Sequence, residues 1–397
     1  MMKKTTSKQI SLLLSNIDHI LFLLVCIMII FGLIMLATAG PASSERINIS
    51  SMHFFANQIV YAFCSIFIML FIAFLKEEYL IKVVYIGFIF SVLGLILLPF
   101  FGDVNKGAKR WLNIIGVSVQ PSEILKPFYS FIIAKILSNK QYLEKQNNNQ
   151  NSFFSPLKNI FITENGRFFC VFLIHLPIAT LIIIQPDFGM TITITLSILT
   201  QLFISNLPWI WIIISCSLIL ILFVFCYITM PHVNQRIDLF FNNGNALTYQ
   251  IEKSLASYSR GGAFGVGPGE GIVKYHLPDS HTDFIFAVAG EEFGSIPCLV
   301  IITLFAAIVL RSLYLSLQTK DDFSLISIVG IVTYIAFQSI FNIGVTLNIL
   351  PTKGMTLPFI SYGGSALIAS SCGIGIILNL VAKTKHNNRI NIIHIKY

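Results

Sequence analysis

Charged side chains are scarce in this sequence. Asp, Glu, Lys and Arg make up 11% of its 397 residues, against about 25% in an ordinary soluble domain. Hydrophobic residues make up 55%. This composition excludes a soluble globular domain and predicts a protein that crosses a membrane several times.

Cysteine pairs and a cleavable signal are also missing. The seven cysteines all fall within apolar runs and none forms a CxxC pair, so disulfides and zinc sites are not expected. The N-terminus is basic and then apolar, but the run from Ile20 to Ala39 is long enough to span a bilayer, and no A-x-A site follows it. We interpret this run as a first spanning helix.

Apolar segments of spanning length occur about ten times along the chain. The expected fold class is therefore an all-α polytopic integral membrane protein, with residues 1–397 forming one transmembrane domain. A large loop outside the membrane, residues 231–282, is expected between the seventh and eighth helices. The predicted spans are approximately residues 18–40, 54–75, 83–101, 120–138, 167–185, 188–206, 208–230, 283–310, 324–347 and 359–382.

The distribution of basic residues predicts the orientation of these spans. Lys and Arg concentrate on the cytoplasmic side of membrane proteins. This bias makes both tails, residues 1–17 and 384–397, cytoplasmic, and it makes the 231–282 loop extracytoplasmic. The net charge of +8 therefore indicates topology, and contacts of the basic C-terminal tail with membrane lipids, rather than a nucleic-acid partner.

Several basic residues on the predicted outer side break this bias, namely Lys106, Lys109, Arg110, Lys126 and Lys353. Such residues are candidates for binding an anion, and we expect Arg110, Lys126 and Lys353 to do so. Lys126 shares a helix face with Glu123, three positions earlier, so mutual neutralisation of these two charges is the alternative for that pair. A second carboxylate within a span, Glu292, needs a cation, and we expect Lys353 to pair with Glu292 or with Asp283.

The most polar stretch of the chain, residues 249–294, adjoins an apolar run. Asp283 stands at the boundary, directly before Phe284, and an ionisable side chain there is a functional candidate. Asp283 is therefore the expected catalytic residue. The neighbouring histidines and carboxylates show no ordered ligand spacing, so no metal site is expected among them.

Two further features of the sequence are a cluster of glycines and a short polar turn. The glycine cluster at residues 261–271 lacks the GK[ST] ending of a nucleotide-phosphate loop, and we expect it to let backbone segments pack closely or move. Gln185-Pro186-Asp187 separates the fifth and sixth spans and has the composition of a tight turn.

Several motifs follow one another from Arg110 to Ser365. They are RW, then QPSE with a following Lys, QPDFG, YQ with the glycine cluster, LPxxHTDFIFAVxGEExG and LPTKGxTLPFISYGGS. This ordered set resembles the SEDS family (shape, elongation, division, sporulation), and residues 352–360 are more similar to its division member than to its elongation member. Departures from the family pattern fall at Pro268, Glu270, Asn348 and Met355, none of them a presumed catalytic position.

The resemblance implies a peptidoglycan glycosyltransferase of the bacterial cytoplasmic (inner) membrane at the division septum. Its substrate would be lipid II, an undecaprenyl-pyrophosphate disaccharide pentapeptide, and its partners a class B penicillin-binding protein and other divisome membrane proteins. The family's essential Asp falls on Asp283. The positions expected to bind substrate are Arg110, Trp111, Gln120, Ser122, Glu123, Lys126, Gln185, Asp187, His281, Thr282, Glu292, Lys353 and Ser361.

The chemistry of these residues agrees with that expectation. Transfer of a sugar from a pyrophosphate-linked donor needs a base for the acceptor hydroxyl and cations for the leaving group. No cofactor motif is evident, and a divalent cation shared by Asp283 and pyrophosphate stays an open alternative. Two other functions stay open as well: a lipid II flippase, which charges within a span would suit, and a non-catalytic divisome scaffold.

Overall fold

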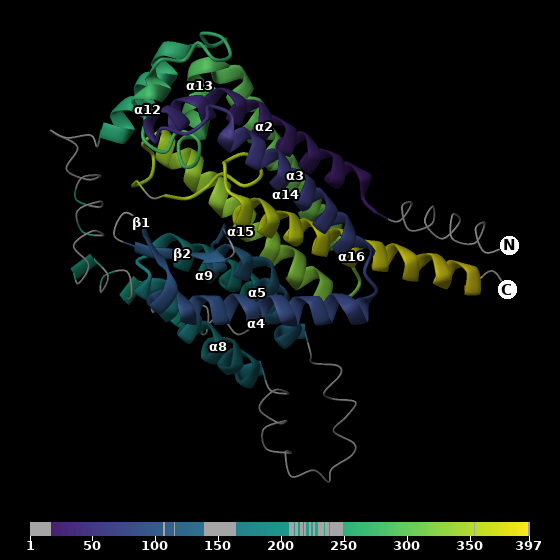
Figure 1. Ribbon diagram of the computed structural model, residues 1–397. Helices are drawn as coiled ribbons and strands as arrows, with labels where there is room; N and C mark the ends of the chain where they lie inside the picture. Colours follow the sequence, from purple (N-terminus) through teal and green to yellow (C-terminus); the bar gives the residue numbers. More distant parts are fainter. Residues whose placement is uncertain are drawn as a thin grey trace.

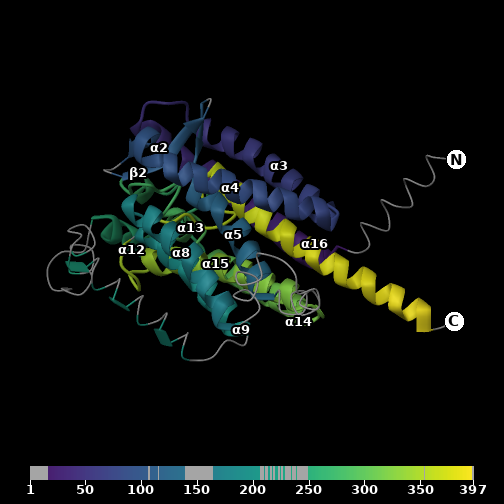
Figure 2. The same ribbon diagram turned by 90° about the horizontal axis from the view of Figure 1, so that it is seen from below.

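The computed structural model of the protein describes residues 17–105, 108–114, 116–138, 164–205, 249–352 and 354–395, with single residues between 210 and 238. Helices predominate in these residues and form one bundle (Figures 1 and 2). In both views β2, α12 and α13 lie at one end of the bundle, and α16 finishes at the opposite end. We call these the loop end and the tail end.

The described helices confirm the all-α polytopic fold class. Seven of them are long and apolar enough to cross a membrane, and α9 is a shorter apolar helix. Most of the seventh predicted span, residues 208–230, lies outside the described residues. The helices that correspond to the other spans are α2 (His19–Arg46), α3 (His53–Phe74), α4 (Glu77–Phe101), α5 (Pro121–Ser138), α8 (Glu164–Ile184), α9 (Phe188–Ile204), α13 (Ile285–Glu292) with α14 (Ser295–Leu317), α15 (Asp322–Thr346) and α16 (Gly364–Ile395).

The eighth predicted span is two helices rather than one. α13 ends at Glu292 and α14 begins at Ser295, so the prediction of a continuous helix over 283–310 is wrong. Gly294 lies at the break with a φ of 85°, a left-handed conformation that glycine adopts without steric cost. A Cβ at Gly294 would also collide with the carbonyl oxygen of Ala263. Close packing against the preceding loop therefore ends the first helix.

The last helix is longer than predicted. α16 begins at Gly364 and continues to Ile395, whereas the predicted span ended at residue 382. Of the predicted C-terminal tail, residues 384–397, those up to Ile395 continue this helix. α16 and α15 form the centre of the bundle. In the most apolar 18-residue stretch of each helix, 89% of the residues of α16 and 67% of those of α15 are buried, against 28% for α3, α4 and α14.

A small antiparallel sheet connects α4 to α5 at the loop end. Its strands are β1 (Asp103–Asn105), β2 (Ala108–Ile114) and β3 (Val117–Val119), in the order β1-β2-β3. Trp111 on β2 pairs with Asp103, and Leu112 pairs with Val119. No strand is predicted here from the sequence. The sheet matters for the site because it determines where Arg110 lies.

Two other segments complete the loop end. α12 (Tyr249–Gly261) is amphipathic, and buries Ile251, Ser254 and Ser257 against the bundle. It leads into the 262–284 loop, and a second segment, residues 351–363, connects α15 to α16. These two segments carry the candidate base Asp283 and three of the predicted substrate-binding residues that the structure describes, His281, Thr282 and Ser361.

Candidate active site

Asp283 lies at the loop end, in the turn that precedes α13. Hydrogen bonds from Thr282 N and Phe284 N to Asp279 O, at 3.1 and 3.2 Å, close this turn. The Asp283 side chain is half-buried. A Cβ added at Gly354 would lie 2.8 Å from Asp283 Oδ2. The carboxylate therefore lies directly against the backbone of the 351–363 segment.

Lys353 is outside the described residues, between Thr352 and Gly354. Its pairing with Asp283 stays a prediction. Its other predicted partner, Glu292, has a different cation: Lys274 Nζ lies 2.5 Å from Glu292 Oε1, and these side chains are 2% and 0% exposed. The prediction that Glu292 needs a cation is thus met by Lys274, which the sequence reading missed.

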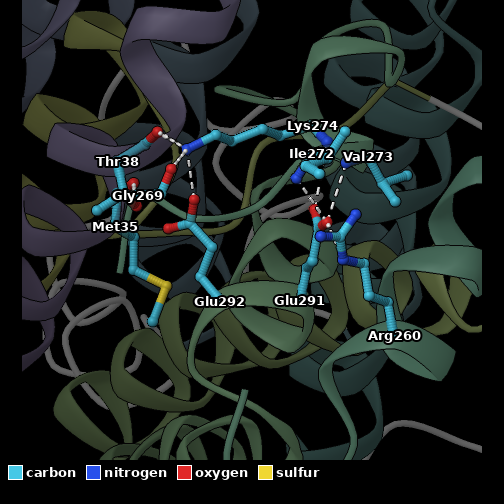
Figure 3. Close-up of polar contacts among 9 residues, drawn as sticks. All are labelled: Met35, Thr38, Arg260, Gly269, Ile272, Val273, Lys274, Glu291 and Glu292. Carbon is cyan, nitrogen blue, oxygen red and sulfur yellow. Dashed lines mark hydrogen bonds and ion pairs between the residues drawn. The ribbon is translucent and has the colours of Figure 1, made fainter. Parts of the chain in front are cut away.

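Glu291 and Glu292 at the end of α13 point in different directions (Figure 3). Glu292 faces Lys274, whose Nζ also donates hydrogen bonds to the carbonyl oxygens of Thr38 on α2 and Gly269, at 2.9 and 3.1 Å. Glu291 Oε1 accepts from the backbone N–H groups of Ile272 and Val273, at 2.8 and 2.9 Å, and lies 3.6 Å from Arg260 Nε. Both carboxylates therefore fasten the 262–284 loop to the bundle.

The glycine cluster packs closely, as its composition predicted. A Cβ at Gly261 would collide with the carbonyl oxygen of Gly290, and one at Gly265 with that of Glu292. Gly267 N also donates to Glu292 O at 3.0 Å. The missing side chains let the loop lie against the last turn of α13, so the two glutamates can reach it.

Two hydrogen bonds tie the residues just before Asp283 to the end of the 351–363 segment. Ser361 Oγ donates to Thr282 O at 2.6 Å, and Tyr362 N donates to His281 O at 3.0 Å. The His281 ring stacks on Phe54 of α3, with centroids 4.3 Å apart. The Tyr362 ring packs edge-on against the same Phe54, with centroids 4.9 Å apart. The structure thus brings His281, Thr282 and Ser361 together beside Asp283.

Glu123 and Lys126 form a buried ion pair on α5. Lys126 Nζ lies 2.5 Å from Glu123 Oε2, and the two side chains are 1% and 4% exposed. Lys126 also donates to Gln338 Oε1 at 2.5 Å, and Gln338 Nε2 donates to Thr356 O at 3.0 Å. The pair is therefore connected to the 351–363 segment through one amide of α15, and the mutual neutralisation left open by the sequence is what the structure shows.

The start of α5 brings two more of the predicted residues into the interior. Gln120 and Ser122 are both buried. Gln120 N donates to Ser365 Oγ of α16 at 3.0 Å, and Pro121 packs against α4, since a Cβ at Gly94 would lie 2.8 Å from Pro121 Cγ. These contacts anchor the helix that carries Glu123 and Lys126.

Arg110 belongs to a second group, at the hairpin between α8 and α9. Its Nη2 donates to Pro186 O, and its Nε donates to Gln185 O at 3.4 Å and lies 3.9 Å from Asp187 Oδ2. Asp187 also caps α9 by accepting from Met190 N at 3.2 Å. Three predicted site residues, Arg110, Gln185 and Asp187, are thus adjacent, and Trp111 follows on β2.

Two amides that the sequence reading missed lie on α15. Gln338 contacts the Lys126 and Glu123 pair, and Asn342 contacts Asp283 and Met355. A signal for them does exist, because carboxamides one helical turn apart are unusual in an apolar span and share one helix face.

Comparison with known proteins identifies the family. The sequence model of the FtsW, RodA and SpoVE group, described as cell cycle protein, matches residues 18–386. The chain belongs to this family. The SEDS resemblance is thereby confirmed over almost the whole chain.

Curated relatives of this SEDS chain include proteins named probable peptidoglycan glycosyltransferase FtsW. The one from Caulobacter vibrioides is 33% identical over 358 residues, which cover 90% of this chain and 87% of that protein. The one from Coxiella burnetii is 31% identical over 368 residues, which cover 89% and 93%.

Solved structures share the SEDS fold seen here. A chain from a structure described as "Structural coordination of polymerization and crosslinking by a peptidoglycan synthase complex" has a TM-score of 0.73 and 22% identity, covering 93% of this chain and 98% of that one. The Rod shape determining protein RodA of Thermus thermophilus has a TM-score of 0.64 and 22% identity, covering 92% and 97%.

Proposed function

We propose that this protein is a peptidoglycan glycosyltransferase that polymerises lipid II during septal cell-wall synthesis. The observation that carries the proposal is the half-buried carboxylate of Asp283, held against the 351–363 segment at the loop end. The names of the relatives, at 31–33% identity over most of both chains, support the same activity.

In this proposal Asp283 is the general base. It takes the proton from the acceptor sugar hydroxyl as that oxygen bonds to the anomeric carbon of the donor. The bond between this carbon and the undecaprenyl pyrophosphate breaks, and the pyrophosphate leaves with the electron pair. A positioned base contributes about 10²–10⁴ in rate.

Cations of the predicted outer side would hold the pyrophosphate. Arg110, with a side chain 28% exposed, and Lys353 are the proposed anion binders, since charge-assisted hydrogen bonds to phosphate oxygens are strong. Lys126 is neutralised by Glu123 and acts through Gln338 in this scheme. Glu292 acts through Lys274, by holding the loop that ends at Asp283.

The proposed location is the bacterial inner membrane at the septum. In it the loop end faces the extracytoplasmic side, where lipid-linked substrate is presented, and the tail end faces the cytoplasm. A class B penicillin-binding protein is the proposed partner. The description of a related fold as part of a peptidoglycan synthase complex supports that choice.

Polymerisation of purified lipid II by the protein with its cognate partner tests the function. Asp283→Asn keeps the size of the side chain and removes the base, so this variant is expected to insert and to bind its partner but to form no glycan. Asp279→Asn is the matched control in the same turn. Its backbone has a φ of 56°, which Asn tolerates, and its rate is expected to fall without being abolished.

The same assay also distinguishes the polymerase from the second candidate function, a lipid II flippase. A buried ion pair within the helices, Glu123 and Lys126, is a feature that a lipid II flippase would use. Translocation of labelled lipid II in vesicles, with no glycan formed by the wild-type complex, would favour the flippase. Glycan formation at wild-type rate by Asp283→Asn would remove the general-base assignment.

A further inference from the structure

Two buried amide side chains lie one turn apart on α15. Gln338 is 1% exposed and Asn342 is 2% exposed, and residues at this spacing share one face of a helix. Burial of an amide in a membrane-spanning helix is unfavourable unless its hydrogens are bonded. The partners of these two amides therefore indicate why they are present.

Asn342 joins two segments with one nitrogen. Its Nδ2 donates to Asp283 O at 2.8 Å and to Met355 O at 2.5 Å. An amide nitrogen carries two hydrogens, and each of them is bonded to a carbonyl of a different segment. A buried carbonyl that loses its donor is destabilised, because the cost of removing it from water is then not compensated. The two segments are thus held at the separation that one amide nitrogen can bridge.

These two carbonyls bracket the candidate active site. The first belongs to Asp283, so Asn342 fixes the backbone from which the carboxylate extends. The second belongs to Met355, which follows Gly354, and a Cβ at Gly354 would lie 2.8 Å from Asp283 Oδ2. The bridge therefore determines how the carboxylate lies relative to the segment in front of it.

Gln338 holds Thr356, the residue that follows Met355 in the same segment. Its Nε2 donates to Thr356 O at 3.0 Å and to Thr356 Oγ1 at 3.2 Å, and its Oε1 accepts from Lys126 Nζ at 2.5 Å. The consecutive carbonyls of Met355 and Thr356 are thus both held from α15. Through Gln338, the buried Glu123 and Lys126 pair of α5 is connected to the same segment that lies against the Asp283 carboxylate.

We propose that Asn342 is a positioning residue for Asp283, and that Gln338 links this position to the Lys126 and Glu123 pair. The inference rests on the function proposed above and adds residues that act through backbone carbonyls. Neither amide contacts the sugar in this scheme. Their role is to hold the base and the 351–363 segment in the geometry that the reaction needs.

The test is steady-state polymerisation of lipid II by the complex with the partner. Asn342→Asp keeps the shape of the side chain and removes both donors when it is ionised. A misplacement of about 1 Å can cost about 10²-fold in rate, so kcat is expected to fall on that order while KM for lipid II stays near the wild-type value. Asn342→Ser keeps one hydroxyl donor and is expected to have an intermediate kcat.

Asn379→Asp is the matched control. Asn379 lies on α16, is 7% exposed, and its Nδ2 donates to the carbonyls of Ile72, Ala73 and Leu75 at 3.0, 3.2 and 2.7 Å. The same substitution there removes the same donors at the end of α3, away from Asp283. It is expected to lower the melting temperature of the purified protein and to leave kcat unchanged.

Two results would overturn the positioning role. One is a wild-type kcat in folded Asn342→Asp protein. The other is an equal loss of kcat in Asn379→Asp, which would make the effect one of fold stability. If Asn342→Asp does not fold, the same two comparisons are made with Asn342→Ser. A wild-type complex that forms no glycan would instead overturn the proposed function, and this inference with it.

Discussion

Lys274 and Glu292 form an ion pair that is almost completely removed from solvent. Their Nζ and Oε1 atoms are 2.5 Å apart, and the more exposed of the two side chains is 2% accessible. Lys274 comes from the 262–284 loop and Glu292 from the end of α13. The pair therefore connects the loop that leads into Asp283 to the helix that follows it.

Removal of one partner should destabilise the protein. In Glu292→Gln the Lys274 ammonium stays buried without its carboxylate, which typically costs about 3–5 kcal/mol. The melting temperature of the protein in detergent measures this loss. Glu252→Gln is the control, because Glu252 pairs with Lys253 at 3.7 Å while 59% exposed, and such surface pairs contribute about 0–1 kcal/mol. Equal melting temperatures for the two variants would contradict the structural role of the buried pair.

Two glycines of the cluster allow the cost of backbone strain to be measured apart from the cost of lost close packing. Gly265 has a φ of 79° and Gly269 a φ of 85°. A Cβ at Gly265 would collide with the carbonyl of Glu292, but a Cβ at Gly269 would meet nothing within 4 Å. Gly269→Ala is thus expected to cost only the conformational term, about 1–2 kcal/mol. Gly265→Ala should lower the melting temperature clearly further, and a similar shift for both would mean that packing against α13 does not matter.

Arg110 should affect activity through both its charge and its shape. Its guanidinium donates to the carbonyls of Gln185 and Pro186, and we propose that it also binds pyrophosphate. Arg110→Gln is expected to reduce polymerisation strongly with the protein still present in the membrane. Arg110→Lys keeps the charge but lacks the planar fork, so it should retain part of the activity.

The control for Arg110 is its neighbour on β2. Lys109 Nζ donates to Pro99 O at 2.8 Å, so Lys109→Gln removes a positive charge from the same strand without touching the hairpin. Its polymerisation rate should stay near that of the wild type. Loss of the protein from the membrane in Arg110→Gln would instead indicate that Arg110 holds the hairpin and the sheet together.

Hydrophobic runs were sufficient to predict most helices. A run of about 20 apolar residues can satisfy its backbone hydrogen bonds in a bilayer only as a helix, so α3, α5 and α9 begin and end within a few residues of the predicted limits. The break between α13 and α14 at Gly294 could not be predicted from hydrophobic runs, because it depends on the close approach of Ala263. Composition does not encode which loop will lie against which helix.

Motifs identified Asp283 and the family, but not the contacts within the site. The charge pair of Glu123 and Lys126 is local in sequence and could be anticipated from helix periodicity. Lys274 could not be matched to Glu292, since the loop that carries Lys274 is placed against α13 by close glycine packing and by hydrogen bonds to Glu291. Such a match needs the path of the chain and not only its order.

The sequence by itself determined the membrane-spanning class, the family and the candidate base, because hydrophobic length and ordered motifs are properties of short stretches. Only the tertiary structure decided which carboxylates face inward and which amides hold the active-site backbone. Asn342 is distant in sequence from Asp283, and the two meet because α15 is packed in the centre of the bundle. Interactions of this kind arise from helix packing and long-range closure, to which a local pattern of residue types is insensitive.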